Sequence, residues 1–267
     1  MKQQDIATGF QQVDHAQSDF LINLLLRVNA APSVQECLQE QLRWLDIKEG
    51  YAILDVGCGM GNQAFEMAKR VGPLGKVVGT DMSESMIEVS KKQYLTFGLP
   101  LTFQMARATE QPFPDASFDR IRTERVLLYV QELDRAFKEF YRLLKPGGRL
   151  LAFDVDMDGL IIAHPNKSLT RKIITFISDS FPNGRIGSEL LSHFNNANFR
   201  DCSVKQFGYM MSCDALKEIY GGILATGIEK GVFTETEVTD WWHSLDQENQ
   251  KGNHVSSLSG FLVMGTK

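Results

Sequence analysis

Apolar residues recur along the chain at two spacings, one typical of helices and one typical of buried strands. Residues 17–30 and 33–46 carry apolar positions three and four apart, which predicts two helices separated at Pro32. Short apolar runs then alternate with amphipathic segments as far as residue 155. We predict strands at 51–56, 76–80, 101–106, 118–123 and 149–155, with helices between them at 64–71, 83–97 and 133–144.

This alternation predicts an α/β fold, in which right-handed crossovers give a mostly parallel sheet with helices on both faces. The pattern changes after residue 156. It then predicts helices near 166–181 and 186–197, a strand near 203–211, helices between 214 and 250, and a last strand at 260–266. We expect that last strand to be antiparallel. The predicted organisation is a helical cap at residues 1–48, followed by one α/β domain at 49–267 with a helical insert near 157–200.

Composition narrows the class of protein. The chain has 267 residues, of which 43% are apolar and 23% charged, as in a globular domain with an elaboration. Its net charge of −5 offers no basic surface, so we expect no nucleic-acid partner. No apolar run reaches the length of a membrane span, and the start MKQQDIATGF lacks the features of a signal or transit peptide, which predicts a cytoplasmic protein. The oligomeric state is not readable from the sequence.

The four cysteines form no C-x-x-C pair. Since metal knuckles and redox pairs need such spacing, we predict no metal site and interpret the cysteines as buried thiols.

The strongest local signal is the run ILDVGCGMG at residues 53–61, a strand followed by alternate glycines and then a helix. Glycines let a ligand approach the backbone, and the first turn of a helix offers free N–H groups to an anion. The spacing G-x-G-x-G differs from the G-x-G-x-x-G of dinucleotide sites, which argues against NAD. We therefore predict a ligand with a carboxylate; the alternative is a tight turn that binds nothing.

Asp81 ends the second predicted strand, twenty residues after Gly61. An acid at that place can accept hydrogen bonds from both hydroxyls of a ribose. The alternative is a structural role at the start of the helix that follows, ahead of Ser83.

Four motifs in this order, LDVGCGMGN, VVGTDMS, PFPDASFD and LLKPGGRLLAFD, resemble the class I S-adenosylmethionine-dependent methyltransferases. The resemblance covers residues 50–156 strongly and the rest weakly, and it is greatest to the small-molecule branch that includes ubiquinone and menaquinone C-methyltransferases. It implies a Rossmann-like seven-stranded sheet, mostly parallel with an antiparallel last strand, and S-adenosylmethionine as the cofactor.

The resemblance also implies roles for individual residues. Met82 would pack on the adenine and Asp81 would hold the ribose. The methionine end of the cofactor would lie against a loop of Asp55, Gly57, Cys58, Gly59 and Gly61.

The chain departs from the family at Arg107, where the family often has an acid that accepts from the adenine amine. Because arginine has only donors, Arg107 either stacks on the ring or lies outside the pocket, while the backbone N–H of Ala108 can still serve a ring nitrogen. Glu124 would favour the positively charged sulfonium, and Arg125 would pair with the cofactor carboxylate or with Glu124.

Methyl transfer needs chiefly an in-line approach of the nucleophile and exclusion of water, so a dedicated base is optional. We name candidates for a base without assigning one, and each has a structural alternative: His15, Tyr129, Asp154, Asp156 and His164. The family often has histidine at the position of Tyr129.

The predicted function is methylation of a small, apolar or aromatic acceptor, because the N-terminal helices and residues 157–182 are rich in Leu, Ile and Phe. Those side chains alternatively only bury helix faces. Two other hypotheses stay open: a protein or nucleic-acid methyltransferase, although no N/D-P-P-Y/F box occurs, and a regulatory protein that binds the cofactor without turnover. One of Trp241 and Trp242 is a further candidate to cover the cleft.

Overall fold

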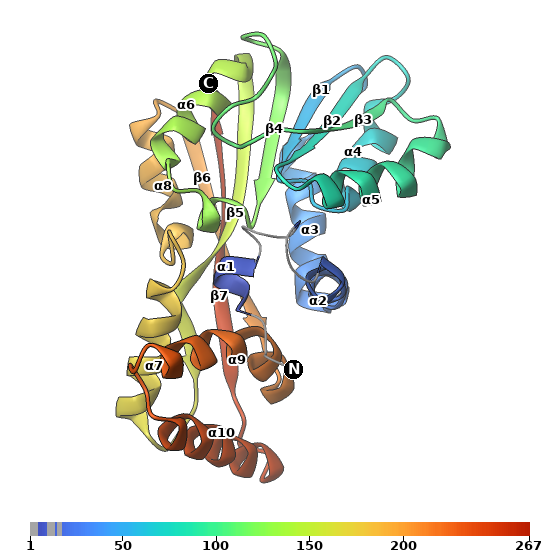
Figure 1. Ribbon diagram of the computed structural model, residues 1–267. Coiled ribbons are helices and arrows are strands. Elements are labelled where there is room, and N and C mark those ends of the chain that lie inside the picture. The colour runs from blue at the N-terminus through green and yellow to red at the C-terminus, as the bar shows by residue number, and fades with distance from the viewer. Residues whose placement is uncertain (1–4, 10–13, 15–17) are drawn as a thin grey trace.

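The computed structural model describes residues 5–9, 14 and 18–267, which contain a seven-stranded sheet in the order β3-β2-β1-β4-β5-β7-β6 (Figure 1). β7 is antiparallel to both of its neighbours, and the other adjacent pairs are parallel. This confirms the predicted fold class. The strands are β1 Ala52–Val56, β2 Lys76–Asp81, β3 Leu101–Met105, β4 Phe118–Glu124, β5 Leu144–Ile162, β6 Arg200–Met210 and β7 Ser256–Thr266.

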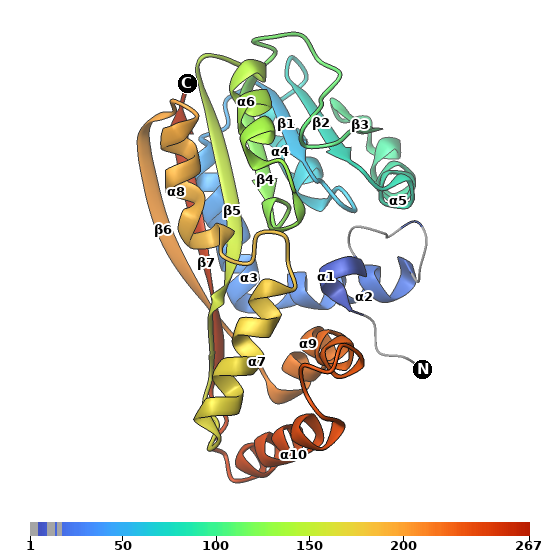
Figure 2. The same cartoon turned by 60° about the vertical axis from the view of Figure 1, so that its left-hand side comes forward.

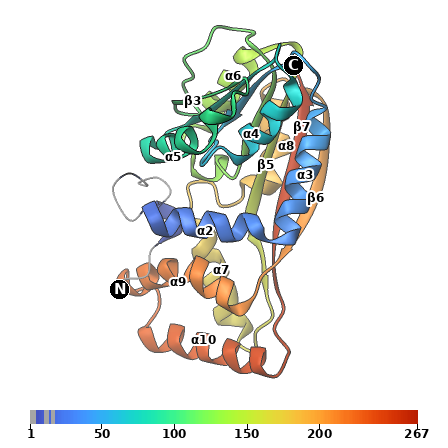
Figure 3. The ribbon, with the colours of Figure 1, turned by 90° about the vertical axis from the view of Figure 1, so that its right-hand side faces the viewer.

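The helices pack on both faces of the sheet, and the core lies between the layers. α3 and α4 cover one face, while α6 and α8 cover the other (Figures 2 and 3). The helices are α1 Ile6–Gly9, α2 Ser18–Ala30, α3 Pro32–Leu45, α4 Asn62–Val71, α5 Glu84–Tyr94, α6 Leu133–Leu143, α7 Lys167–Asp179, α8 Ile186–Asn196, α9 Cys213–Glu229 and α10 Glu235–Gln250, with 3-10 turns η1 Leu95–Phe97 and η2 Leu127–Tyr129.

The central strands of the sheet determine where the polar side chains Asp55 and Arg122 lie. β1 is almost entirely buried between β2 and β4, as expected for a parallel strand covered on both faces. Its register sets Asp55 between Gly79 on one side and Arg122 on the other. Because these strands are parallel, their carboxyl ends meet at one edge of the sheet, where ligands bind in open α/β folds.

β5 is longer than the sequence predicts. The predicted strand stops at residue 155, but pairing with β7 continues across a bulge to Ile162, and β7 begins at Ser256 instead of residue 260. Residues 157–162 are therefore strand and not part of the predicted helical insert. Asp156 lies just beyond the predicted end of this strand. It is buried, and its carboxylate accepts from the N–H groups of Gly159 (3.1 Å) and Ser188 (2.9 Å).

The extended β5 and β7 form an arm that leads to a second lobe of α7, α9 and α10, and α2 lies between this lobe and the sheet (Figures 1 and 3). In the lobe, the buried indole of Trp241 stacks on His164 and donates to the Thr170 hydroxyl at 2.9 Å. Trp241 is thus a core residue of the lobe. The prediction that it or Trp242 covers the cleft is wrong, since neither lines the cavity described below.

Gly187 tests the packing of α8 on the arm. A Cβ at this position would lie 2.8 Å from the backbone carbon of Val155 and 2.9 Å from the nitrogen of Asp156, and neither atom can move freely. We expect Gly187→Ala to lower the free energy of unfolding by about 1–3 kcal/mol in urea titrations. Gly208→Ala is the matched control, because a Cβ there meets nothing within 4 Å. Equal stability of the two variants would contradict the packing.

Candidate functional site

A cavity of about 1070 Å³ lies at the carboxyl edge of the sheet. This volume is slightly above the usual range for small-molecule sites and leaves room for two molecules side by side. Its wall is assembled from distant parts of the chain, which include the turn after β1, the end of β4 with η2, the α2–α3 pair, and the segment from the end of β6 into α9.

The turn after β1 presents open backbone to the cavity. The N–H groups of Gly57 and Cys58 donate to the Thr80 carbonyl, at 2.7 and 2.9 Å. Gly59 has φ +51°, and a Cβ built on it meets no atom within 4 Å. α4 then begins at Asn62 with neither a side-chain cap nor an acid in its first turn. This leaves free N–H groups and a positive helix end, which suit a carboxylate.

Asp81 stands at the end of β2 and lines the same cavity. Its carboxylate accepts from the N–H groups of Gly59 (2.9 Å) and Ser83 (3.0 Å). Burial raises the pKa of Asp81, and these backbone donors oppose the rise. The cap of α5 is Ser83, whose hydroxyl accepts from the Met86 N–H at 3.2 Å. Asp81 is therefore not the N-cap, and the lone pairs it has left can accept from a ligand.

Two residues expected in the cofactor loop lie beneath the cavity wall. Asp55 is fully buried, and its carboxylate accepts from Arg122 at 2.7 Å. Gly61 packs under Phe103, where a Cβ would come within 2.6 Å of the ring. Both shape the turn from below, and only Gly57, Cys58 and Gly59 of that set line the cavity.

Arg122 is a site residue that sequence reasoning missed. It is buried in β4 and donates to Asp55, to Glu124 and to the Gln41 side chain (2.9 Å) in α3. Burial raises the pKa of Asp55 in spite of this guanidinium. The signal in the sequence was an arginine inside the strand predicted at 118–123, because a buried cation needs a buried acid.

Glu124 and Arg125 form the cavity edge at the end of β4. The Arg125 guanidinium lies 3.1 Å from the Glu124 carboxylate and donates to the Asn29 side chain at 2.5 Å. Of the two partners expected for Arg125, the structure therefore shows Glu124. Arg125 has φ +54°, a left-handed conformation that is costly without glycine and tends to occur at functional sites.

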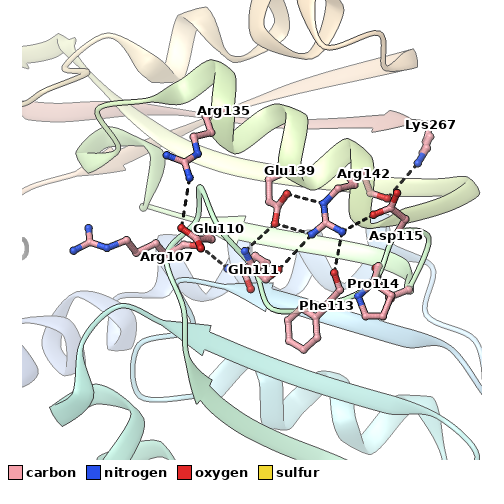
Figure 4. Close-up of polar contacts among 11 residues, drawn as sticks. Arg107, Glu110, Gln111, Phe113, Pro114, Asp115, Arg135, Glu139, Arg142 and Lys267 are labelled. Carbon is pink, nitrogen blue, oxygen red and sulfur yellow. Dashed lines mark hydrogen bonds and ion pairs between the residues drawn. The ribbon is translucent and has the colours of Figure 1, made fainter.

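Arg107 and Ala108 line the cavity on the loop between β3 and β4. The rest of this loop is held by Arg142, which donates to the carbonyls of Gln111 (3.3 Å) and Phe113 (2.9 Å). Figure 4 shows the exposed Arg107 side chain extending away from that cluster. Among the described residues no carboxylate forms an ion pair with it, so its guanidinium is available at the cavity rim.

Of the candidate bases, Tyr129 lines the cavity. Its ring packs edge-on against Phe181 with centroids 5.8 Å apart. The turn that carries it is clamped from outside by Asn183, whose side chain donates to the carbonyls of Leu127 (2.8 Å) and Val130 (2.5 Å). Burial raises the pKa of Tyr129 well above its usual value.

The other candidate bases lie elsewhere. Asp154 is fully buried behind η2 and accepts from the Leu128 N–H at 3.2 Å, without lining the cavity. Asp156 accepts from the Gly159 N–H in the arm of β5 and β7, and the ring of His164 forms a hydrogen bond with the Trp241 carbonyl in the second lobe. A direct catalytic contact by any of these three is thus not supported by the geometry. His15 lies outside the described residues.

A cap of α2 and α9 closes the side of the cavity away from the sheet. Arg27 of α2 forms an ion pair with Glu218 of α9, and both line the cavity. The Thr226 hydroxyl of α9 donates to Asp5 at 2.9 Å, which ties the start of the described chain to the same helix.

Comparisons with known proteins agree with this architecture. The model of a methyltransferase-domain family matches residues 47–198. A phosphoethanolamine N-methyltransferase of Arabidopsis thaliana is 36% identical over 45% of this chain and 24% of its own length. A ubiquinone/menaquinone biosynthesis C-methyltransferase of Bordetella avium is 38% identical over 41% of this chain and 43% of its own.

A solved structure shares the fold. Phosphoethanolamine N-methyltransferase 2 of Haemonchus contortus, in complex with S-adenosyl-L-methionine, aligns with a TM-score of 0.61 at 18% identity over 98% of this chain and 59% of its own. The chain spans about half or less of the length of the curated relatives it matches. Within the described residues, no helix has the length and apolar character to span a membrane, and no cluster of three metal-binding side chains occurs.

Asp154 gives the site a pH-dependent stability. Burial raises its pKa to about 7, against the opposing pull of backbone donors such as the Leu128 N–H. Because the folded state then holds the proton more tightly than the unfolded state, this group contributes stability below about pH 4 that is lost as the pH rises through about 7.

We expect the difference in unfolding free energy between wild type and Asp154→Asn to fall by about 2 kcal/mol from pH 5.5 to pH 8, because asparagine does not titrate. Urea titrations at the two pH values measure it. A difference that does not change with pH would show that Asp154 ionises normally.

Proposed function

This chain belongs to the class I S-adenosylmethionine-dependent methyltransferases, since the family model covers more than half of it, and we propose that it methylates a small, apolar or aromatic acceptor. One observation carries the proposal: the open glycine turn, the uncapped start of α4 and the Asp81 carboxylate all face one cavity that has room for two molecules. Those groups match the carboxylate and the ribose of this cofactor.

The residues present fit the cofactor. We propose that the first N–H groups of α4 hold its carboxylate, that Gly59 leaves room for the cofactor because it has no side chain, and that Asp81 accepts from the ribose hydroxyls. Met82 and Arg107, on neighbouring loops of the cavity, would flank the adenine. When bound, S-adenosylmethionine supplies an electrophilic methyl group on a sulfonium.

The chain contributes mainly position and charge. Glu124 places a negative carboxylate at the edge of the cavity, where it favours a cation, and Arg122 and Arg125 hold that carboxylate in place. The cap of α2 and α9 excludes water from the acceptor. No base is assigned, because the raised pKa of Tyr129 keeps its hydroxyl protonated near neutral pH, and Asp154, Asp156 and His164 do not line the cavity.

The acceptor side of the cavity supports an apolar molecule. Its wall is made largely of aliphatic, methionine and aromatic side chains, including Leu24, Val28, Leu38, Val155, Met157, Met211, Ile219 and Leu258. Such a surface gains by burying apolar area and cannot hydrate a strongly polar substrate.

Gly59→Ala tests the cofactor site. Its Cβ would point into the space proposed for the cofactor and touches no protein atom. We expect S-adenosylhomocysteine to bind at least about tenfold more weakly in isothermal titration, because the methyl group fills the cradle. The matched control is Gly50→Ala, which has φ +82°, nothing within 4 Å and no place on the cavity wall.

Both variants should lose a similar stability of about 1 kcal/mol from the left-handed backbone, so only a difference in affinity reports the site. Equal affinity of the two variants would remove Gly59 from the cofactor site.

Asp81→Asn should weaken S-adenosylhomocysteine binding by about 5- to 150-fold, since an amide replaces the charged acceptor of the ribose hydroxyls. Asp119→Asn is the control: Asp119 also accepts from a backbone N–H (Ala52, 2.9 Å) and a side chain (Lys145, 2.7 Å), but outside the cavity. An unchanged dissociation constant in folded Asp81→Asn would leave Asp81 a purely structural role.

Turnover is tested by release of S-adenosylhomocysteine from the wild-type protein with panels of phenols, quinols and amines. Release with a phenol or quinol supports the proposed acceptor class. Cofactor binding without release across the panels would favour the non-catalytic binding protein.

A further inference from the structure

The positive charges on the cavity wall are already paired on the acceptor side. Arginines supply all of the positively charged side chains among the described lining residues. Arg27 pairs with Glu218, while Arg122 and Arg125 share Glu124, and Arg122 also holds Asp55. The remaining arginine, Arg107, lies on the loop proposed for the adenine. A phosphate on the acceptor would therefore be buried without a free cation, which is costly.

Tyr129, Tyr209 and Tyr220 also line the cavity, and they differ in what they contact. Tyr209 shares a hydrogen bond with the Cys37 thiol, and Tyr129 packs at the rim against Phe181. Tyr220 of α9 is only 1% exposed, and its hydroxyl donates to the sulfur of Met157 at 3.8 Å.

The contact between Tyr220 and Met157 leaves hydrogen-bonding capacity unused. A thioether is a weak acceptor, whereas buried tyrosine hydroxyls normally find a strong partner. No stronger partner of this hydroxyl occurs among the described residues. The neighbouring wall, with Val155, Ile219 and Leu258, offers none, so an oxygen atom brought in by a ligand would supply the missing partner.

We propose that Tyr220 binds an oxygen atom, hydroxyl or carbonyl, of an acceptor that is otherwise apolar and carries no phosphate or other charge. This inference rests on the proposed function and narrows its substrate class. The apolar wall holds the body of the molecule, and the Tyr220 hydroxyl fixes its orientation toward the cofactor side. Tyr220 is then a specificity-determining residue that touches substrate, without taking or giving a proton.

Three probes of one shape test the proposal: naphthalene, 2-naphthol and 2-naphthyl phosphate, titrated into the full chain saturated with S-adenosylhomocysteine. We expect wild type to bind 2-naphthol about tenfold more tightly than naphthalene, the effect of one buried hydrogen bond. The phosphate should bind at least about tenfold more weakly than 2-naphthol, because every arginine on the acceptor side is already paired with a carboxylate.

Tyr220→Phe keeps the ring and removes the hydroxyl. Its preference for 2-naphthol over naphthalene should fall to about onefold while its affinity for naphthalene is kept, and Tyr209→Phe should retain the wild-type preference. Melting temperatures and the affinity for S-adenosylhomocysteine establish that each variant is folded.

The outcomes separate this inference from the proposed function. Four results would each overturn the role of Tyr220. The preference for 2-naphthol over naphthalene could survive in Tyr220→Phe, or wild type could bind those two probes equally. Wild type could also bind 2-naphthyl phosphate more tightly than 2-naphthol, or bind none of the probes. In those cases intact S-adenosylhomocysteine binding leaves the methyltransferase proposal standing. Loss of S-adenosylhomocysteine binding in wild type would instead overturn the proposed function. If Tyr220→Phe does not fold, the relative affinities of wild type for 2-naphthol and 2-naphthyl phosphate still test whether the site rejects a charged acceptor.

Discussion

The buried ion pair between Asp55 and Arg122 is the interaction on which the site depends. It joins the two central strands, and Arg122 extends it to Gln41 of α3 and to Glu124 at the cavity edge. Such a pair contributes little net stability, but removal of either partner leaves a buried charge without compensation. The centre of the sheet and the electrostatics of the cavity are therefore one network, so that a change in Arg122 would alter both.

Residues that do not line the cavity also hold its wall in place. Asn183, in the turn between α7 and α8, clamps η2, while Asp154 supports it from behind. Arg142 fixes the loop that carries Arg107. Positioning of this kind suits methyl transfer, where orientation of the reactants and exclusion of water supply most of the rate. Two of the candidate bases predicted from the sequence, Asp154 and Asp156, have such a positioning role, because they accept hydrogen bonds from backbone N–H groups.

The local features of the cofactor side could be predicted from the sequence. The alternate glycines around Gly59, the end of β2 at Asp81 and the crossover pattern obey rules that act within a few residues or one strand-helix unit. These rules also gave the order of elements and the antiparallel last strand. They could not separate Asp55 and Gly61, which lie beneath the wall, from Gly59, which faces the cavity, because that depends on what packs below the turn.

The acceptor side was decided by tertiary structure. Tyr220 and Arg27 are more than a hundred residues apart and meet one cavity only because the arm of β5 and β7 carries the second lobe back against α2. The strand predicted to end at residue 155 continues past Asp156, whose buried carboxylate accepts from N–H groups of its own bulge and of α8. His164 is half-buried in the second lobe, where its ring stacks on Trp241. Thus the sequence alone determined the glycine turn and Asp81 through local backbone rules, whereas long-range packing determined which side chains line the end of the cavity proposed for the acceptor.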